Sequence, residues 1–253
     1  MTWRRAVVTG ASSGIGAAMV RKLAEDGVPV VMVARAADRM EALAEELGVD
    51  SEILPADLGT AEGIAATAAR LRSEEDPIDL LVNNAGFGFT GPFAELEIEG
   101  QQSSIDVNVS ALVQLSHAAA TVMVERAGGT ILNVSSVAGS APTPGNAVYG
   151  ATKAFVTSFS QGLHEELRPH NVKVTCLAPG FTRTEFQDRA GYDTTSLPSF
   201  VWQSAEEVAA IGLEAARKGR AVVVPGAQNK ALVGTTKLLP GAVQRRLAGL
   251  FDR

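Results

Sequence analysis

The segment from Thr9 to Gly16 reads TGASSGIG and joins a short apolar run to a stretch whose apolar residues recur at helical spacing. Glycines in such a loop allow a tight turn, a close approach of the backbone to a phosphate group, and tight packing of helix on strand. The first turn of the following helix has backbone N–H groups that are free to bind that phosphate. Because the loop lies between a strand and a helix, dinucleotide binding is favoured over an ordinary turn.

Strand-like and helix-like segments alternate along the rest of the chain. We expect strands at the short β-branched runs Ala6–Thr9, Val30–Val33, Ile53–Leu54, Leu80–Val82, Ile131–Val134, Val172–Leu177 and Ala221–Val224. We expect helices at Ile15–Asp26, Arg39–Leu47, Ile64–Arg72, Gln101–Arg126, Ala147–Leu167 and Ala205–Lys218. A crossover helix is the usual way to return the chain to the start of a parallel neighbour. The alternation therefore predicts an α/β fold of the Rossmann type, a doubly wound sheet of about seven parallel strands with helices on both faces.

Composition sets limits on the number of domains and on the partners. The chain of 253 residues is 46% hydrophobic, enough to bury a sizeable core, and α/β chains of this length commonly form one domain. We expect a single catalytic domain over 1–253, with an insertion at 181–203 and an appended tail at 226–253. The net charge of −6 gives no basic field for a phosphate backbone, so no nucleic-acid partner is expected.

Cysteine and histidine usage points away from disulfide and metal chemistry. Cys176 is the only cysteine, which excludes an intrachain disulfide and a site with several cysteine ligands. Its apolar neighbours in sequence predict a buried strand residue. His117, His164 and His170 have no zinc-binding spacing with another ligand, so no metal site is expected.

The beginning of the chain and its apolar content bear on location. The first residues run straight into a strand without the apolar region and cleavage site of a signal peptide. We expect no stretch that approaches the length of a membrane span, and so no integral membrane segment. These features predict a cytoplasmic protein.

Further short motifs follow the predicted strands in order. They are Asp57-Leu58 after the third strand, Asn83-Asn84-Ala85-Gly86 after the fourth, Asn108 in the long helix, Ser136 after the fifth strand, Tyr149-x-x-x-Lys153, and Pro179-Gly180 after the sixth. Together with the loop pattern T-G-x-x-x-G-x-G, this set resembles the short-chain dehydrogenase/reductase family in its single-domain branch. The resemblance covers most of the chain. It implies an oxidoreductase that uses a nicotinamide dinucleotide to interconvert a carbonyl compound and its alcohol.

The resemblance also implies which residues hold the cofactor. Asp57 and Leu58 would contact the adenine, residues 84–86 the adjoining ribose, and Thr182 and Thr184 the nicotinamide amide and the phosphates. The candidate cofactor-binding residues are Gly10, Ser12, Ser13, Gly14, Ile15, Gly16, Arg35, Asp57, Leu58, Asn84, Ala85, Gly86, Tyr149, Lys153, Pro179, Gly180, Thr182 and Thr184.

Arg35 decides the predicted form of the cofactor, because it stands at the end of the second strand, about twenty residues beyond the loop. An acidic residue there accepts hydrogen bonds from ribose hydroxyls, whereas a cation favours a 2′-phosphate. The alternative is that Arg35 is a solvated charge at a helix start. Ser13 also stands where some NADP-preferring relatives carry Lys or Arg. We expect NADP(H) to be favoured over NAD(H).

Tyr149 and Lys153 lie four residues apart in a predicted helix, so their side chains share one face. Carbonyl reduction needs an acid to protonate the developing alkoxide, and a nearby ammonium lowers a tyrosine pKa from about 10 toward neutral pH. By resemblance, Ser136 binds the substrate oxygen, with Ser135 as the competitor for that role. Asn108 matches the family asparagine that kinks the long helix and holds a water between the lysine and solvent. These four, Asn108, Ser136, Tyr149 and Lys153, are the candidate catalytic residues.

The insertion at 181–203 is rich in aromatic residues, and in relatives it closes over the substrate. Its large apolar side chains are Phe181, Phe186, Tyr192, Leu197, Phe200 and Trp202, with Phe87, Phe89 and Phe93 as possible additions from elsewhere. Aromatic side chains offer large apolar contact area, so we expect a hydrophobic ketone or aldehyde as substrate. The alternative is that several of them only pin the insertion to the domain.

Family members usually pair through two long helices, here Gln101–Arg126 and Ala147–Leu167, so a homodimer is expected. Many tetrameric relatives end soon after the last strand, so the tail puts a tetramer in doubt. The tail segment Val243–Phe251 could form a short basic amphipathic helix that covers the substrate entrance, packs on a neighbouring subunit or touches a membrane surface. With two arginines in it, packing is favoured.

Two other functions are compatible with the fold. A catalytically silent NADP(H)-binding regulator needs no proton donor, and the intact Ser136, Tyr149 and Lys153 argue against it. An epimerase or dehydratase of the extended family also uses Tyr-x-x-x-Lys. Those relatives resemble T-G-x-x-G-x-x-G at the loop and carry a longer C-terminal substrate domain, and both features are missing from this sequence.

Overall fold

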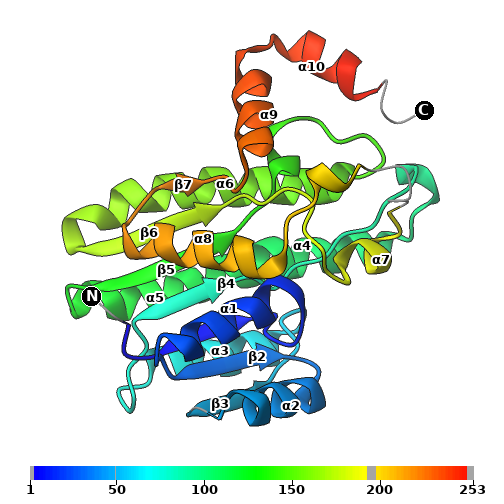
Figure 1. The fold of residues 1–253 in the computed structure, drawn as a ribbon. Helices are drawn as coiled ribbons and strands as arrows, with labels where there is room; N and C mark the ends of the chain where they lie inside the picture. Colours follow the sequence, from blue (N-terminus) through cyan, green and yellow to red (C-terminus); the bar gives the residue numbers. More distant parts are fainter. Residues whose placement is uncertain (1–2, 49, 193–197, 250–253) are drawn as a thin grey trace.

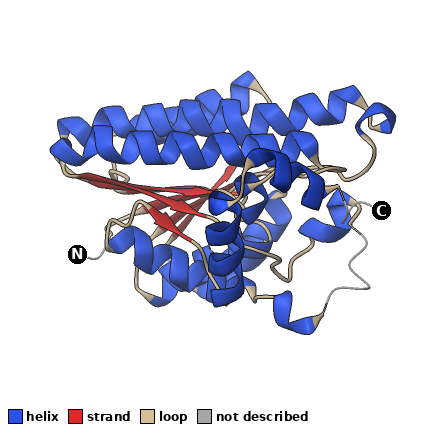
Figure 2. Ribbon diagram, turned by 90° about the horizontal axis from the view of Figure 1, so that it is seen from above, coloured by secondary structure: helices blue, strands red, loops and turns tan. Residues whose placement is uncertain are grey.

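The computed structural model of the chain describes residues 3–48, 50–192 and 198–249 (Figure 1). The predicted insertion and tail extend outside this part, because Leu197, Leu250 and Phe251 are not among the described residues. Within it, helices surround a central sheet, which Figure 2 shows nearly edge-on between two layers of helices.

All strands of this sheet run parallel, in the order β3-β2-β1-β4-β5-β6-β7. They are β1 Ala6–Thr9, β2 Val30–Ala34, β3 Ser51–Pro55, β4 Leu80–Asn83, β5 Gly129–Val134, β6 Val172–Leu177 and β7 Val222–Val223. The strand order reverses between β1 and β4, and doubly wound sheets bind ligands in the crevice outside the carboxyl ends of the strands at such a reversal. The predicted fold class, a Rossmann-type α/β sheet of seven parallel strands, is confirmed.

Two strands differ in length from the predicted ones. β3 is longer than Ile53–Leu54, because all five of its residues pair with β2. β7 is shorter than Ala221–Val224, because its ladder with β6 in the described part of the chain extends over two residues only. The prediction therefore located each strand but missed where pairing with a neighbour begins and ends.

Helices cover both faces of the sheet. They are α1 Gly14–Glu25, α2 Ala37–Leu47, α3 Ala61–Arg72, α4 Ile98–Ile105, α5 Leu112–Glu125, α6 Ala147–Leu167, α7 Phe186–Ala190, α8 Ala205–Arg217, α9 Ala227–Leu238 and α10 Gly241–Ala248. Short 3₁₀ turns lie at Phe93–Glu95, Val137–Ser140, Arg168–His170 and Ser199–Val201. α1, α2 and α8 pack on one face, and α3, α5 and α6 pack on the other (Figure 2).

Two buried clusters of apolar side chains hold the layers together, because successive residues of a strand face opposite sides of a sheet. In β1, Ala6 and Val8 belong to the cluster beneath α1 and α8, whereas Val7 belongs to the cluster beneath α3 and α5. Since both faces of the sheet are covered, its strands read as continuous apolar runs rather than as alternating ones. Each buried side chain of the size of valine or leucine contributes about 1.5–3 kcal/mol of transfer free energy.

The predicted helix Gln101–Arg126 contains a widened turn. A π-helical segment, Asp106–Ala111, joins α4 to α5, and Ile98–Glu125 is one continuous helix. Single π-turns inside α-helices are frequent at functional sites, and this one carries Asn108.

The same helix corrects an expectation about membrane spans. At 28 residues it is long and apolar enough to cross a membrane by length and composition, so the expectation that no stretch approaches that length is wrong. Half of its apolar window is buried inside the protein, which is also typical of a core helix in a globular protein.

The two ends of the insertion at 181–203 are hydrogen-bonded to each other. The backbone N–H of Arg183 donates to Gln203 O (2.9 Å), and that of Gln203 donates to Phe181 O (3.0 Å). α7, which belongs to this insertion, is also fixed to the loop after β4, because Thr90 N donates to Ala190 O (2.9 Å). The insertion therefore lies over the carboxyl edge of the sheet.

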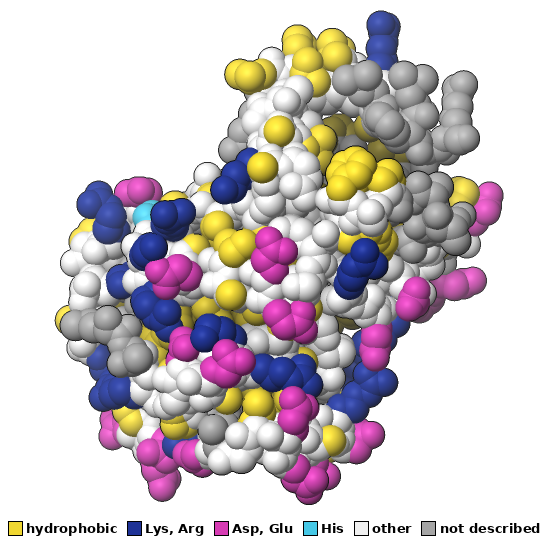
Figure 3. Space-filling view, in the orientation of Figure 1, with side chains coloured by type: hydrophobic (Ala, Val, Ile, Leu, Met, Phe, Trp, Pro, Cys, Tyr) yellow, Lys and Arg dark blue, Asp and Glu magenta, His cyan; other side chains and the backbone are white. Residues whose placement is uncertain are grey.

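The tail projects from the body. α9 begins beside the 3₁₀ turn Val137–Ser140 and points away from the sheet, and α10 follows it (Figure 1). Leu232 is 51% exposed and Leu238 is 86% exposed, and Figure 3 shows hydrophobic side chains on this part of the surface. The predicted tail helix Val243–Phe251 begins earlier, at Gly241, and its described part ends at Ala248.

Candidate active site

In the glycine-rich loop after β1, backbone atoms pack so closely that there is no room for side chains at some positions. Gly10 has φ +65°, in the left-handed region that favours glycine. A Cβ on Gly16 would lie 2.1 Å from the carbonyl oxygen of Gly10, so a side chain at this position would force the first turn of α1 away from the loop. The sequence therefore forms a sharp turn whose backbone is open to a ligand.

The start of α1 fits the pyrophosphate of a dinucleotide. Ser13, the N-cap residue, is extended and its side chain does not cap the helix. The N–H groups of the first turn are consequently free to bind an anion, and the helix dipole favours negative charge there. A Cβ on Gly14 would lie 3.1 Å from Thr184 Cγ2, so Thr184 of the insertion stands against the same loop. Ser12 and Ile15 are partly buried within it.

A threonine that the sequence analysis did not include among the candidates connects this loop to β4. Thr9 Oγ1 donates to Val82 O (3.2 Å) and accepts from the backbone N–H groups of Asn84 and Ala85, each at 3.0 Å. In return, Asn84 Nδ2 donates to Thr9 O (2.9 Å). Thr9 is the first letter of the loop motif, so its position was the available signal, but its bonds to β4 depend on strand order.

The residues expected to bind the adenosine end lie in separate places along the carboxyl edge. Leu58 is buried, while Asp57 is exposed and accepts a hydrogen bond from Gly59 N (2.9 Å) through Oδ1. Arg35 follows β2 and is exposed, and it makes no hydrogen bond or ion pair with any described residue. Its guanidinium is therefore available to a ligand.

A second arginine near Arg35 contacts the insertion. Arg39 of α2 pairs with Glu185 at 3.0 Å, and Glu185 also pairs with Arg189. Nothing local in the sequence indicates that Arg39 has a partner at residue 185, so this arginine was not among the predicted site residues. This ion pair joins the adenosine side of the crevice to the segment over the substrate side.

Tyr149 and Lys153 are both buried on one face of α6. The ammonium of Lys153 lies 5.6 Å from the centre of the Tyr149 ring and donates to Val134 O (2.9 Å). The other side of the ring lies against Gly88, where an added Cβ would come within 2.7 Å of Tyr149 Cδ2. The phenol is thus enclosed between the strand edge and the loop after β4.

Electrostatics at this pair differ from the expected direction. Burial raises the pKa of the Tyr149 phenol, and a hydrogen bond with Ser136 opposes this rise. Burial lowers the pKa of the Lys153 ammonium to about 8. The pKa of Tyr149 is therefore raised where the sequence predicted a lowered value, because desolvation of the phenol outweighs its hydrogen bond with Ser136.

The two neighbouring serines have different surroundings. Ser135 is buried, and its hydroxyl donates to Lys153 O (2.7 Å) and lies 2.7 Å from Thr157 Oγ1. Ser136 is only partly buried, interacts with Tyr149, and accepts a hydrogen bond from Ala138 N (3.1 Å). The arrangement favours Ser136 for contact with a bound molecule, because the hydroxyl of Ser135 is already hydrogen-bonded to residues of α6.

Asn108 fixes the loop after β4 through its side-chain amide. Its Nδ2 donates to Phe87 O (2.9 Å) and to Thr152 Oγ1 (3.0 Å), and its Oδ1 accepts from Phe87 N (3.0 Å). Gly86 lies between Asn108 and Lys153, because a Cβ there would be 2.9 Å from Asn108 Oδ1 and 3.2 Å from Lys153 Nζ. The π-turn thus brings the amide next to the lysine.

Aromatic residues extend from Tyr149 into the insertion. The ring centre of Phe186 lies 5.4 Å from that of Tyr149 and 6.5 Å from that of Tyr192. Phe181 packs on Tyr192 (6.3 Å) and on Trp202 (5.6 Å), and these contacts pin the insertion. Phe87 and Phe89 contact each other edge-on, whereas Phe93 (61%) and Phe200 (72%) are exposed to solvent.

The loop after β6 packs against the 3₁₀ turn that follows Ser136. The carbonyl of Pro179 accepts from Val137 N (3.0 Å), and the hydroxyl of Thr182 donates to Gly180 O (3.1 Å). A Cβ on Gly180 would lie 2.4 Å from Oδ1 of Asn229, so the start of α9 packs directly on this loop. The tail therefore begins next to the candidate site.

The cysteine lies behind the candidate site, near Lys153 and Thr157, and the histidines do not belong to the site. Cys176 is buried in β6, and burial raises the pKa of its thiol. His164 Nδ1 lies 2.7 Å from Val174 O, and His117 and His170 are exposed. Among the described residues, no group of three or more His, Cys, Asp or Glu side chains could hold a metal ion.

A glycine-rich loop at the strand-order reversal, beside a buried tyrosine and lysine on one helix, defines a dinucleotide-binding oxidoreductase. A family model described as "short chain dehydrogenase" matches residues 4–194 of the chain. The chain belongs to the short-chain dehydrogenase family.

Several proteins that resemble the chain are dehydrogenases. A short-chain dehydrogenase from Sphingobium yanoikuyae in complex with NADPH is 39% identical, with a TM-score of 0.84 over 92% of this chain and 93% of that one. A bulky-bulky ketone specific alcohol dehydrogenase from Comamonas testosteroni is 33% identical, with a TM-score of 0.80 over 96% and 97%. A serine 3-dehydrogenase of Rhizobium radiobacter is 37% identical over 181 residues, 71% of this chain and 72% of that protein. The chain is thus an oxidoreductase of this family.

The lowered pKa of Lys153 predicts how stability depends on pH. Between pH 8 and 10.5 the unfolded chain keeps a proton on this lysine that the folded chain has lost, so folding becomes more favourable as the pH rises. The free energy of unfolding of the wild type, minus that of Lys153→Met, is expected to increase by up to about 3 kcal/mol across this window. Urea denaturation followed by circular dichroism at several pH values measures it.

Lys230→Met is the matched control, because Lys230 is exposed. Its pH profile should parallel that of the wild type. A Lys153→Met profile that also parallels the wild type between pH 8 and 10.5 would mean that burial does not lower the pKa of Lys153 in solution.

Proposed function

We propose that the protein is an NADP(H)-dependent oxidoreductase that interconverts a hydrophobic ketone or aldehyde and its alcohol, with Tyr149 as general acid and base. The observation that carries the proposal is the convergence of Tyr149, Ser136 and Lys153 at the carboxyl edge of the sheet, beside a loop that fits a pyrophosphate. When bound, the cofactor supplies the hydride. The chain supplies the binding site and the proton.

The roles of the residues follow from their contacts. The hydroxyls of Tyr149 and Ser136 interact, so one carbonyl oxygen can accept a hydrogen bond from both. Tyr149 then delivers the proton as the alkoxide forms, or removes it in the reverse direction. Protonated Lys153, whose ammonium lies 5.6 Å from the centre of the Tyr149 ring, is proposed to oppose the effect of burial on the phenol. Asn108 positions the loop that carries Phe87 and Gly86 against the lysine.

NADP(H) is favoured over NAD(H) by the exposed, unpaired guanidinium of Arg35 after β2. A cation at this place accommodates a 2′-phosphate, whereas NAD(H) offers it only neutral hydroxyls. The Sphingobium yanoikuyae relative holds NADPH, which is consistent with this preference. Ser12, Thr184 and the N–H groups of Gly14, Ile15 and Gly16 are the groups proposed to bind the phosphates.

The apolar substrate class rests on the aromatic cluster formed by Tyr149, Phe186, Tyr192 and Phe181. Such rings bury large apolar area and place few demands on the shape of the ligand. A relative that covers most of the chain is specific for bulky ketones, and this supports the same class here. A catalytically silent regulator of the same fold would leave the enclosure of Tyr149 and Lys153 without a purpose.

Replacing Tyr149 tests the mechanism. Tyr149→Phe is expected to lower kcat/KM for an apolar ketone by about 10²–10⁴-fold, because the proton donor is lost while the ring remains. NADPH binding, measured by fluorescence titration, should survive. NADPH oxidation followed by absorbance with a panel of aldehydes and ketones measures turnover. Turnover at the wild-type rate in this variant would remove Tyr149 from the mechanism.

The adjacent serines provide the control. Ser136→Ala should lower kcat/KM by about 10–100-fold, through loss of a hydrogen bond to a charged oxygen. Ser135→Ala should act mainly on stability, by about 1–3 kcal/mol, because its hydroxyl is bound to Lys153 O and Thr157. A greater loss of turnover in Ser135→Ala would reverse the proposed roles.

Replacing Arg35 tests the preference for the phosphorylated cofactor. Arg35→Ser is expected to reduce the ratio of kcat/KM for NADPH over NADH by about 10–100-fold, the value of one charge-assisted contact. Arg220→Ser, which removes an exposed arginine distant from β2, should leave the ratio unchanged. An unchanged ratio in Arg35→Ser would show that the arginine is only a solvated charge.

We also propose one catalytic domain over 1–253, a cytoplasmic location and a homodimer. Cys176 is a buried free thiol, as is common in reducing compartments. α6 presents a stacked pair of exposed or half-buried rings, Phe155 and Phe159, beside the exposed small residues Ala151 and Ala154. Apolar surface flanked by small side chains allows a second α6 to pack closely.

A charge on this face should separate the subunits. Analytical ultracentrifugation is expected to show a dimer for the wild type and a shift toward monomer for Phe155→Glu, because the buried carboxylate would lack a partner. Phe200→Glu is the control, since Phe200 is exposed on the insertion and outside the proposed contact. A monomeric wild type at micromolar concentration would refute the proposed pairing.

A further inference from the structure

The tail, described over residues 227–249, is attached to the body at the base of α9. There the buried side chain of Asn229 donates to Gln203 Oε1 (2.9 Å). Further along, α10 folds back on the end of α9, because the side-chain amide of Gln244 donates to Thr236 O (2.7 Å). The two helices therefore form a corner that stands away from the sheet (Figure 1).

Apolar side chains are exposed on this projection. Leu232 is 51% exposed, Leu238 at the corner is 86% exposed, and Val243 of α10 is 39% exposed. Phe200 of the insertion (72%) lies beside the base of α9, because Gln228 Nε2 donates to Phe200 O (3.5 Å). Four of the seven exposed large apolar side chains in the described part of the chain thus gather on the tail or at its base. Single exposed apolar residues are ordinary, whereas such a group marks an interaction site.

The charge of the tail is opposite to that of the body. Residues 227–249 contain four Lys or Arg and no Asp or Glu, whereas residues 1–226 contain 17 Lys or Arg against 27 Asp or Glu, a net charge of −10. Lys230, Arg245 and Arg246 are exposed, and none of them forms an ion pair with a described residue. The tail therefore presents unpaired positive charge together with apolar side chains, on a protein that is otherwise acidic.

We propose that the tail binds the protein to the surface of an anionic lipid bilayer. Interfacial helices place apolar side chains at the boundary between headgroups and acyl chains, while Lys and Arg attract anionic headgroups. Leu238 and Val243 are the apolar side chains that enter this boundary. Such a surface repels the acidic body, so contact depends on the projection of the tail away from it.

A second copy of the chain is the other possible occupant of this surface. A protein partner has to place carboxylates at fixed positions opposite Lys230, Arg245 and Arg246, and a fitted apolar surface opposite Leu238. Lipid headgroups instead diffuse to the cations, and acyl chains adapt to any apolar shape. The combination of a protruding apolar corner with cations on both helices therefore favours the bilayer.

Co-sedimentation with sucrose-loaded vesicles tests the inference. The partition coefficient of the wild type is expected to be at least about 100-fold higher on vesicles of roughly 3:1 phosphatidylcholine and phosphatidylglycerol than on phosphatidylcholine alone, and to fall when about 0.5 M NaCl is added. Arg245→Gln combined with Arg246→Gln should weaken binding to the anionic vesicles by about 10–30-fold, through loss of two charges. Leu238→Ser should weaken it by about tenfold, through loss of an apolar side chain.

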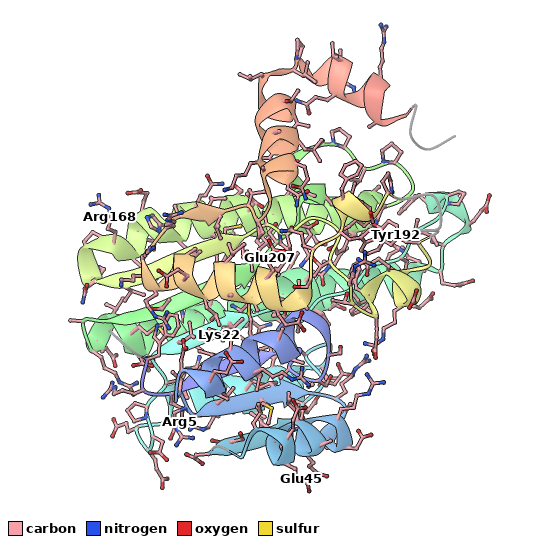
Figure 4. All side chains as sticks on the ribbon, in the orientation of Figure 1. Arg5, Lys22, Glu45, Arg168, Tyr192 and Glu207 are labelled. Carbon is pink, nitrogen blue, oxygen red and sulfur yellow. The ribbon has the colours of Figure 1, made fainter. Side chains whose placement is uncertain are left out.

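Matched controls make the same changes outside the tail. Arg168→Gln combined with Arg220→Gln removes two exposed arginines, and Ile98→Ser removes an apolar side chain that is 63% exposed. Figure 4 shows Arg168 at the end of α6, away from the tail. Both controls should bind the anionic vesicles as the wild type does. Circular dichroism and sedimentation velocity monitor folding and oligomeric state in every variant.

Four results would overturn the inference. They are equal binding of the wild type to both kinds of vesicle, binding to neither, unchanged binding in the two tail variants, and an equal loss in tail variants and controls. A tail variant that turns a dimer into a monomer would also overturn it, because the tail would then pack on a second copy. None of these results bears on the proposed function, since vesicle binding requires neither cofactor nor substrate.

Discussion

The hydroxyl of Thr9 holds together the two halves of the sheet at the point where the strand order reverses. By donating to Val82 O and accepting from the N–H groups of Asn84 and Ala85, it fixes the distance between the loop after β1 and the loop after β4. Everything at the carboxyl edge depends on that distance. The loop after β1 is the one proposed to bind the phosphates, and the loop after β4 carries Gly86 and Gly88 against the lysine and the tyrosine. A wider gap would separate the cofactor side from the side that donates the proton.

Desolvation determines the electrostatics of the site. Tyr149 and Lys153 are enclosed by β5, by the loop after β4 and by the insertion, so each is driven toward its neutral form. Proteins tolerate such a pair where the charged states are needed only in part of a reaction cycle. The hydrogen bond from Lys153 to Val134 O holds the ammonium beside the tyrosine.

The sequence predicted features that depend on local spacing, and it failed where distant segments decide. The strands, the loop Thr9–Gly16 and the shared face of Tyr149 and Lys153 were predicted correctly, because each follows from periodicity or from a motif. The predicted direction of the shift in the Tyr149 pKa was wrong, because four-residue spacing brings two side chains together without revealing how deeply they are buried. The contact of Asn146 with Tyr192 joins segments that no local pattern relates.

The ion pair between Arg39 and Glu185 attaches one flank of the insertion to α2. Both side chains are about half exposed, so the pair contributes roughly 0–1 kcal/mol and is screened by salt. On the other flank, the insertion is anchored by backbone bonds between Phe181 and Gln203 and by ring packing around Phe181. The flank at Arg39 is thus attached by a weak ion pair, and the flank at Phe181 and Gln203 is attached more strongly by backbone hydrogen bonds and ring packing. Raising the ionic strength therefore weakens the attachment at Arg39 and leaves the attachment around Phe181 and Gln203 intact.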